Sequence, residues 1–241
     1  MSGHSKWATT KRQKAVVDAK KGAAFTKYGN LITIAARRGG DPTINFSLRM
    51  AIDKARGVNM PKENIERAIK RGTGELGGAQ IEELTYEGFG PAKSQFIVKC
   101  LTDNKNRTAA EIRHVFSEAG GALGTVAWNF ELKGVILISS EELQSKNLLN
   151  NDDFELELID AGAQDIKKEA AGSTIYSKPE SLQKIKDFLE TKNIKTEAAE
   201  IEYVAKENSQ LDGENKEKFQ KFIETLENNE DITDYYTNIS L

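Results

Sequence analysis

Cysteine, histidine and long apolar runs are scarce in this sequence of 241 residues, and each shortage excludes a class of protein. The single cysteine, Cys100, cannot form an internal disulfide, which excludes a disulfide scaffold and fits a reducing compartment. Cys100 alternates with Phe96 and Val98 in an apolar strand pattern, so we expect a buried small side chain rather than a reactive thiol. No apolar run approaches the roughly 18 residues of a membrane span.

Signal sequences and catalytic signatures are also missing. Met1–Trp7 lacks the apolar stretch of a signal peptide, and we expect a cytoplasmic protein without membrane attachment. The two histidines, His4 and His114, lie far apart, and no His/Cys cluster has metal-site spacing, so no metal or cofactor is expected. Phosphate-binding loop, dinucleotide fingerprint and nucleophile elbow are all absent. The sequence therefore favours a protein that is not an enzyme.

Charge is distributed very unevenly along the chain. Residues 1–75 contain 16 Lys and Arg against 6 Asp and Glu, a net charge of +10. Because the whole chain carries −3, residues 76–241 must carry −13. Segregated charge of this kind indicates that the basic third binds a polyanion.

The basic third has the periodicity of three short amphipathic helices. Apolar residues recur at helical spacing from Phe25 to Ala35, and Gly39-Gly40 ends the pattern. A second helix is expected after Pro42, with Ile44, Leu48, Ala51, Ile52 and Ala55 on one stripe and an end at Gly57. A third is expected to begin at Pro61 and to end at Gly72-Thr73-Gly74. Together these segments predict a three-helix bundle.

The basic residues of this bundle fall into two groups. Six lie at expected helix ends, where the helix dipole alone favours cations and no ligand is needed. They are Arg37, Arg38, Lys54, Arg56, Lys70 and Arg71. The second group crowds around the start of the first helical segment, where a helix prefers acidic residues, and comprises Lys6, Lys11, Arg12, Lys14, Lys20 and Lys21. We expect a nucleic acid to relieve that repulsion; a merely solvated basic tail is the alternative.

Trp7 and His4 lie within the same basic segment. Trp7 has no apolar neighbour except Ala8, and stacking on a base or packing against the bundle are both open interpretations. His4 is either a nucleic-acid contact or a solvated residue. Both residues are included among the candidate contacts.

The acidic remainder has the pattern of alternating strands and helices. Strands are expected at Glu83–Phe89, Ser94–Thr102 and Thr125–Leu132, with a helix at Thr108–Ala119 between the last two. A second set of elements follows in the order strand, helix, strand, strand, helix, strand, which is the ferredoxin-like pattern. Its segments are Gly134–Ser139, Glu141–Leu149 with an extension through Asp153–Asp160, Ala163–Glu169, Ser173–Ser177, Pro179–Lys192 and Glu200–Lys206.

A helix at Glu214–Glu227 and a strand at Ile232–Ile239 remain at the end of the chain. They cannot bury a sheet edge alone, so we expect them to rejoin the first α/β unit. The expected domains are 1–75, a discontinuous domain of 80–133 plus 207–241, and an inserted domain of 134–206. The fold class is α+β.

One polar motif, Thr102–Thr108, stands at a strand-to-helix turn. Lys105, Asn106 and Arg107 are candidates for an anion site, because the free amides of a helix N-terminus attract anions. The alternative is that Asn106 or Asp103 simply caps the helix.

These motifs resemble the YebC/PmpR family. The resemblance is carried by Gly3–Trp7, Ala51–Arg56, Asn59–Lys62, Asn64–Ile69, Tyr86–Gly88 with Gly90-Pro91, Leu101–Thr108 and Tyr236–Asn238. It covers essentially the whole chain and implies a helical bundle followed by two ferredoxin-like α/β domains, the last inserted into the middle one. It also implies that Gly3 to Trp7 and the neighbouring basic residues are the contact region.

The sequence departs from the family pattern at several positions. Ala23 stands where the family often has a basic residue. Lys11-Arg12-Gln13-Lys14 stands where Lys-His-Arg-Lys is more usual, so the positive charge is kept but one arginine is shifted along the chain. Gly90-Pro91-Ala92-Lys93 replaces a Gly-Pro-Gly-Gly pattern. The Gly120–Phe130 loop is a few residues shorter than in the family, which puts any role of that loop in question.

Two functions follow from the resemblance. Bacterial members are usually described as DNA-binding transcriptional regulators, whereas others, including a mitochondrial activator of cytochrome oxidase subunit I translation, act on the ribosome at difficult proline-containing sequences. The acidic remainder would be repelled by duplex phosphates, and no clear helix-turn-helix is present. DNA and ribosomal RNA therefore both remain candidate partners, and a monomer is expected. An enzyme that uses Arg107 on its α/β part is the least favoured of three hypotheses, beside a DNA-binding regulator and a ribosome-bound factor.

Overall fold

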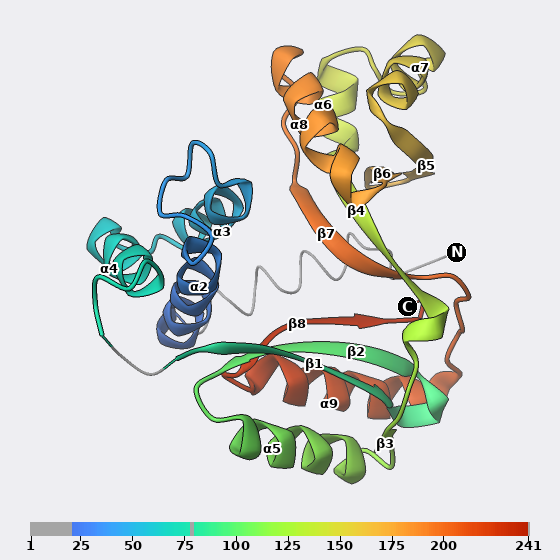
Figure 1. Cartoon of the computed structure of the whole chain (residues 1–241). Coiled ribbons are helices and arrows are strands. Elements are labelled where there is room, and N and C mark those ends of the chain that lie inside the picture. The colour runs from blue at the N-terminus through green and yellow to red at the C-terminus, as the bar shows by residue number, and fades with distance from the viewer. Residues whose placement is uncertain (1–20, 78–79, 241) are drawn as a thin grey trace. The chain divides into compact units, whose positions relative to one another are not determined.

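A computed structural model describes residues 21–77 and 80–240, with side chains from residue 24 onward. It divides into two compact units. One is formed by Ala127–Ser209 with Ser240, and the other by the described part of Arg12–Val126 with Gln210–Ile239 (Figure 1).

The chain begins with three helices, α2 (Lys21–Ala36), α3 (Phe46–Gly57) and α4 (Lys62–Gly72). Their apolar faces meet in one core, in which Ile32, Leu48 and Ala55 are completely buried. Asn45 caps α3, since its side chain accepts a hydrogen bond from the backbone of Leu48 at 3.1 Å. Pro61 is the residue before α4 rather than its first residue. The three-helix prediction is confirmed.

The first sheet has the order β3-β1-β2-β8 and is antiparallel. Its strands are β1 (Glu82–Phe89), β2 (Gln95–Thr102), β3 (Ala122–Leu123) and β8 (Ile232–Thr237). A 3-10 turn, η1 (Pro91–Lys93), joins β1 to β2. Helices α5 (Lys105–Glu118) and α9 (Gly213–Asn228) cover one face of this sheet (Figure 1). The C-terminal helix and strand therefore complete a sheet begun more than a hundred residues earlier.

Aromatic side chains hold those distant segments together. Phe96 on β2 is fully buried and lies 4.9 Å, centroid to centroid, from Phe222 on α9. Phe116 on α5 lies 5.1 Å from the same Phe222, with the rings nearly perpendicular. Edge-to-face pairs of this geometry add stability beyond the area that they bury.

The second sheet has the order β5-β6-β4-β7, which is the ferredoxin-like order for its sequence of elements. A turn, η2 (Ala127–Asn129), precedes it, and its strands are β4 (Phe130–Ser139), β5 (Ala163–Glu169), β6 (Gly172–Ser177) and β7 (Ala198–Ala205). Its helices are α6 (Ser140–Ser145), α7 (Asp152–Ala161), η3 (Pro179–Ser181) and α8 (Leu182–Thr191). Ile136 and Ile138 on β4 are completely buried.

The fold class is confirmed: three N-terminal helices are followed by two antiparallel sheets. The exact domain boundaries stay a prediction. Several element boundaries were wrong. β4 is a single strand where two, Thr125–Leu132 and Gly134–Ser139, were expected, and α6 and α7 are separate helices. The helix expected at Thr108 begins at Lys105.

Ile44 is also corrected. It was expected on the buried stripe of the second helix, but it precedes α3 and is 84% exposed. Within the described part of the chain, every helix is too short or too polar to cross a bilayer.

Candidate nucleic-acid interface

The candidate contacts of the basic tail lie largely outside the described residues. His4, Lys6, Trp7, Lys11, Arg12, Lys14 and Lys20 precede the described part of the chain. Lys21 is the first residue of α2, and its side chain is not described. The assignment of these eight residues to nucleic-acid binding stays a prediction.

The described part of the bundle is itself basic. Residues 21–75 carry 11 Lys and Arg against 5 Asp and Glu, a net charge of +6. On α4 the apolar residues Ile65 and Ala68 point into the bundle, whereas Arg67, Lys70 and Arg71 are exposed. None of these three cations forms an ion pair with a carboxylate of the described residues. This leaves the outer side of α4 with cations that are available to an external anion.

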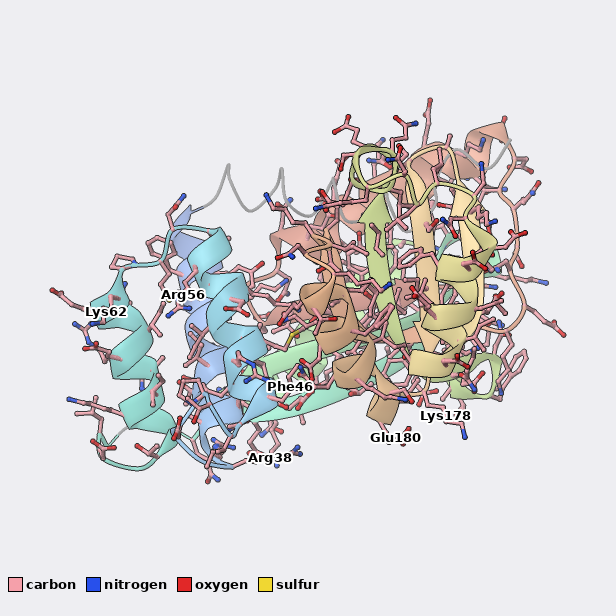
Figure 2. All side chains as sticks on the ribbon, turned by 90° about the horizontal axis from the view of Figure 1, so that it is seen from above. Arg38, Phe46, Arg56, Lys62, Lys178 and Glu180 are labelled. Atoms are coloured by element: carbon pink, nitrogen blue, oxygen red, sulfur yellow. The ribbon has the colours of Figure 1, made fainter. Side chains whose placement is uncertain are left out.

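Two further cations on the bundle are paired with acids on their own helix. Arg56 lies 3.7 Å from Asp53, and Lys62 lies 3.5 Å from Glu66. All four side chains are about half exposed or more, and such pairs contribute little stability and are screened by salt. Figure 2 shows Lys62 projecting from the bundle, so these cations also remain accessible to solvent.

The helix-end explanation holds for only part of the basic residues. Lys54 and Arg56 lie in the last turn of α3, and Lys70 and Arg71 in the last turn of α4, as expected. Arg37 and Arg38, in contrast, follow the last residue of α2. Arg37 donates a hydrogen bond from Nη2 to the carbonyl oxygen of Ile81 at 2.6 Å, so it ties the bundle to the segment that enters β1.

The connection between α2 and α3 is held by side-chain hydrogen bonds. The Asn45 amide donates to the carbonyl oxygens of Ala35 at 2.9 Å and Gly39 at 2.7 Å. Asp41 accepts hydrogen bonds from the backbone N–H and the hydroxyl of Thr43 at 2.8 and 2.7 Å, which lower the pKa of Asp41. The loop is therefore fixed in shape although it lies at the surface.

This loop holds Ile44 in the solvent, and Arg49 donates a hydrogen bond to the carbonyl oxygen of Thr43 in the same loop at 3.5 Å. The Arg49 guanidinium lies 5.7 Å from the centroid of the Phe46 ring, a cation–π distance. Figure 2 shows Arg38 and Phe46 at one end of the bundle, away from Arg56 and Lys62. Sequence reasoning missed Ile44 as a surface residue. The signal was Asn45, a favoured N-cap residue, because a cap at this position leaves Ile44 outside the helix.

The second candidate, at the N-terminus of α5, is occupied by the chain's own carboxylates. Lys105 lies 2.6 Å from Glu82, and Arg107 Nη2 lies 3.1 Å from both carboxylate oxygens of Asp231. Arg107 also approaches Asp103 at 3.5 Å and Glu111 at 3.8 Å. The hydrogen bond and charge of Asp231 raise the pKa of Arg107.

The helix cap at this site is Asn104, so the expectation of Asp103 or Asn106 was wrong. The Asn104 side chain accepts a hydrogen bond from the backbone of Arg107 at 3.1 Å. An external anion at Lys105, Asn106 and Arg107 would have to displace the internal acids, and the anion site stays a prediction. Sequence reasoning missed Asp231, because 124 positions separate it from Arg107.

No group of three metal-ligating side chains occurs among the described residues. His114, the described histidine, lies 3.3 Å from Glu118 on the outside of α5.

Comparison with known proteins identifies the family of the chain. Residues 5–75 match the TACO1/YebC protein N-terminal domain, and residues 81–239 match the TACO1/YebC second and third domain. The chain belongs to the TACO1/YebC family.

The similarity to individual relatives extends over the full length. A "probable transcriptional regulatory protein" of Thermoanaerobacter pseudethanolicus is 46% identical, over 100% of this chain and 98% of the relative. A protein of the same description from Dictyoglomus turgidum is also 46% identical, over 100% of this chain and 96% of its own. The crystal structure of a conserved hypothetical protein from Aquifex aeolicus matches with a TM-score of 0.80 and 38% identity, covering 92% of this chain and 91% of that one.

Proposed function

We propose that this protein is a non-enzymatic regulator of gene expression that binds nucleic acid through its basic helical region, residues 1–75. The observation that carries the proposal is the segregation of charge, +10 in this region against −13 in the remainder. Seven of the nine arginines of the chain also lie in residues 1–75, and Ala127–Ser209 contains none. Arginine suits phosphate recognition because its planar guanidinium donates several hydrogen bonds at once.

The described part of the helical bundle also offers exposed cations for nucleic-acid binding. Arg67, Lys70 and Arg71 are exposed on α4 without an acid partner among the described residues, which is the arrangement that phosphate contacts require. The names of the relatives, which are regulatory proteins rather than enzymes, agree with this role.

Charge reversal in the basic tail tests the proposal. The variant Lys11→Glu, Arg12→Glu, Lys14→Glu should lose nucleic-acid binding in fluorescence anisotropy with labelled RNA and duplex DNA. A matched control, Lys146→Glu, Lys178→Glu, Lys195→Glu, makes the same change in net charge at exposed lysines within Ala127–Ser209 and should bind almost normally. Equal losses in the two variants would show that only total charge matters.

The salt dependence gives an independent measure. If about six phosphates are neutralised, affinity should fall on the order of 10³-fold between 50 and 200 mM salt. A salt slope near zero would exclude the basic bundle as the binding surface. Circular dichroism of each variant checks that the helices remain folded.

The first candidate for the partner is DNA, which the word "transcriptional" in the relatives' names favours. The second is ribosomal RNA, and the charge of −13 on residues 76–241 favours it. A large acidic region is repelled by bare duplex phosphates, whereas a ribosome presents basic proteins beside its RNA. In this second candidate the protein assists translation of proline-rich or otherwise stalling sequences.

Sedimentation separates the two partners. Cell lysate treated with deoxyribonuclease is run on a sucrose gradient, and the protein is located by immunoblotting. Co-migration with ribosomes, lost in the Lys11, Arg12 and Lys14 variant, would support ribosomal RNA. Absence from the ribosomal fractions together with selective binding to promoter fragments would support DNA.

A further inference from the structure

Helix α7 has two apolar faces, although only one of them is covered within its unit. Phe154, Leu158 and Ala161 are buried toward the sheet, and the Phe154 ring stacks near Phe188 of α8 at 6.4 Å. Leu156 and Ile159 lie on the opposite side of the helix, 60% and 54% exposed. Residues three apart are neighbours on a helix surface, so these two side chains form one apolar patch.

This outer face is rigid. Asn151 caps the start of α7 by accepting a hydrogen bond from the backbone of Phe154 at 3.0 Å. Gly162 ends the helix in the left-handed conformation, with φ of 117°. A partner would therefore find Leu156 and Ile159 already in place, without the cost of ordering a loop.

The acidic side chains around the apolar patch favour a positively charged partner. Helix α7 contains five acidic residues and no basic residue. Lys168 and Lys192 neutralise Glu155 and Glu157 from neighbouring elements. Asp152, Asp153 and Asp160 remain exposed near Leu156 and Ile159, and their carboxylates form no ion pair with a described cation. Lys184 donates a hydrogen bond from Nζ to the backbone carbonyl oxygen of Asp160 at 2.9 Å.

Three occupants conflict with this charge. Nucleic acid and anionic lipid would be repelled by the aspartates, and two copies of α7 facing each other would bring together six aspartates that have no ion pair within the described residues. The basic bundle of a second copy has suitable charge. Among the described residues, however, Ile44 and Leu76 are its exposed large apolar side chains, on separate loops rather than in a stripe.

We propose that the outer face of α7, defined by Leu156 and Ile159 within the ring of Asp152, Asp153 and Asp160, is a docking site for a basic amphipathic helix of another protein. Apolar side chains of that helix would cover Leu156 and Ile159, and flanking lysines or arginines would meet the aspartates. This inference does not depend on which nucleic acid the basic bundle binds. It gives the protein a second, chemically opposite contact surface.

The probe is a synthetic 18-residue peptide of leucine and lysine with the leucines at helical spacing, added to the full ¹⁵N-labelled chain. We expect NMR shifts centred on the amides of α7 and weaker binding at high salt. A scrambled peptide of the same composition has no apolar stripe and should bind at least about tenfold more weakly.

Matched variants locate the site. Leu156→Ser with Ile159→Ser should weaken peptide binding at least about tenfold. Leu132→Ser with Ile201→Ser removes two other exposed apolar side chains of the same unit, 42% and 41% exposed, and should leave binding unchanged. All four residues lie at the surface, and the NMR spectrum of each variant reports directly whether it is folded.

Three results would overturn the proposal. They are equal binding of the scrambled peptide, equal loss in the two double variants, and shifts that centre on another element. Sedimentation velocity adds a fourth: a dimer abolished by Leu156→Ser with Ile159→Ser would assign the face to a second copy of this chain. Nucleic-acid binding by the basic tail would be unaffected by any of these results.

Discussion

At the scale of single residues, Asp231 connects polar groups of two elements that lie more than a hundred residues earlier in the chain. Its carboxylate accepts a hydrogen bond from the Thr108 hydroxyl at 2.6 Å as well as the contacts from Arg107, and its side chain is only 14% exposed. Its backbone carbonyl accepts from Leu101 at 2.8 Å. One residue near the C-terminus thus satisfies polar groups of both β2 and α5.

Replacement of Asp231 by alanine should lower the free energy of unfolding by about 1–3 kcal/mol, since a largely buried hydrogen-bonded carboxylate is lost. Asp103→Ala is the matched control, because Asp103 contacts the same arginine at 3.5 Å but is half exposed, and it should cost about 0–1 kcal/mol. Urea unfolding measures both. Equal effects would mean that Asp231 contributes no more than a surface ion pair.

Cys100 gives a second test at this scale. Burial raises the pKa of its thiol to about 12, with smaller contributions from the charges of Asp231 and Glu111. At pH 8 the thiolate fraction is then roughly one in ten thousand, and the native protein should react very slowly with a thiol reagent. Addition of urea should restore rapid reaction.

The sign of the pH effect follows from the raised pKa. The unfolded chain, with a thiol pKa near 9.0, releases its proton first, so Cys100 contributes stability that declines as the pH rises above that value. Rapid reaction of the native protein at pH 8 would contradict both the burial and the shift.

At the scale of elements, the close contact between α2 and α4 depends on Gly72. A Cβ atom at this position would clash with the backbone oxygen of Thr33 and lie 2.6 Å from the Ala36 Cβ. Gly72→Ala should therefore destabilise the bundle by about 1–3 kcal/mol. Gly29 lies inside α2 with open space around it, and Gly29→Ala should stabilise the bundle by about 0.5–1 kcal/mol.

Amide hydrogen exchange of α2 to α4 measures these opposite effects within one bundle. Protection should decrease in Gly72→Ala and increase in Gly29→Ala. Nucleic-acid affinity of Gly29→Ala should stay unchanged if the cations alone make the contacts. A loss of protection in both variants would contradict the close approach at Gly72 as the cause.

The same elements show what sequence patterns can predict. Amphipathic periodicity located the three bundle helices and most strands within a few residues. It failed at Gly134, which was expected to separate two strands. A Cβ there would lie 3.0 Å from the Leu182 Cβ, so this glycine permits packing of α8 on an uninterrupted β4.

For the candidate sites, tertiary contacts limit how much the sequence alone can predict. The charge imbalance and the basic tail were visible in the sequence, because composition and order are local properties. The partner of Arg107 was not, since Asp231 approaches it only after the sheet closes. Helical periodicity likewise cannot tell which of two apolar faces of α7 becomes buried.

At the scale of the whole molecule, the first sheet is complete only with the C-terminal strand paired to β2. β8 pairs with β2, and Phe219 and Phe222 of α9 surround Phe96. Ala127–Ser209 forms its own compact unit in between. Phe96 on β2 pairs with Thr237 on β8, whereas the pairing of Phe130 with Ala205 spans a shorter stretch of chain within the other unit. Loop-closure entropy rises slowly with this separation, so the two units differ only modestly in that cost.

This arrangement predicts that damage to the aromatic cluster stays within one unit. Phe222→Ala should destabilise the sheet of β1, β2 and β8 by about 3–5 kcal/mol, because it leaves a cavity between Phe96 and Phe116. Hydrogen exchange should accelerate in those strands and remain unchanged in β4, β6 and β7. Leu158→Ala, in the core of the other unit, should produce the reverse pattern. If either substitution accelerated exchange equally in both sheets, the chain would unfold as one cooperative body, and the insertion of 134–206 as an independent domain would be wrong.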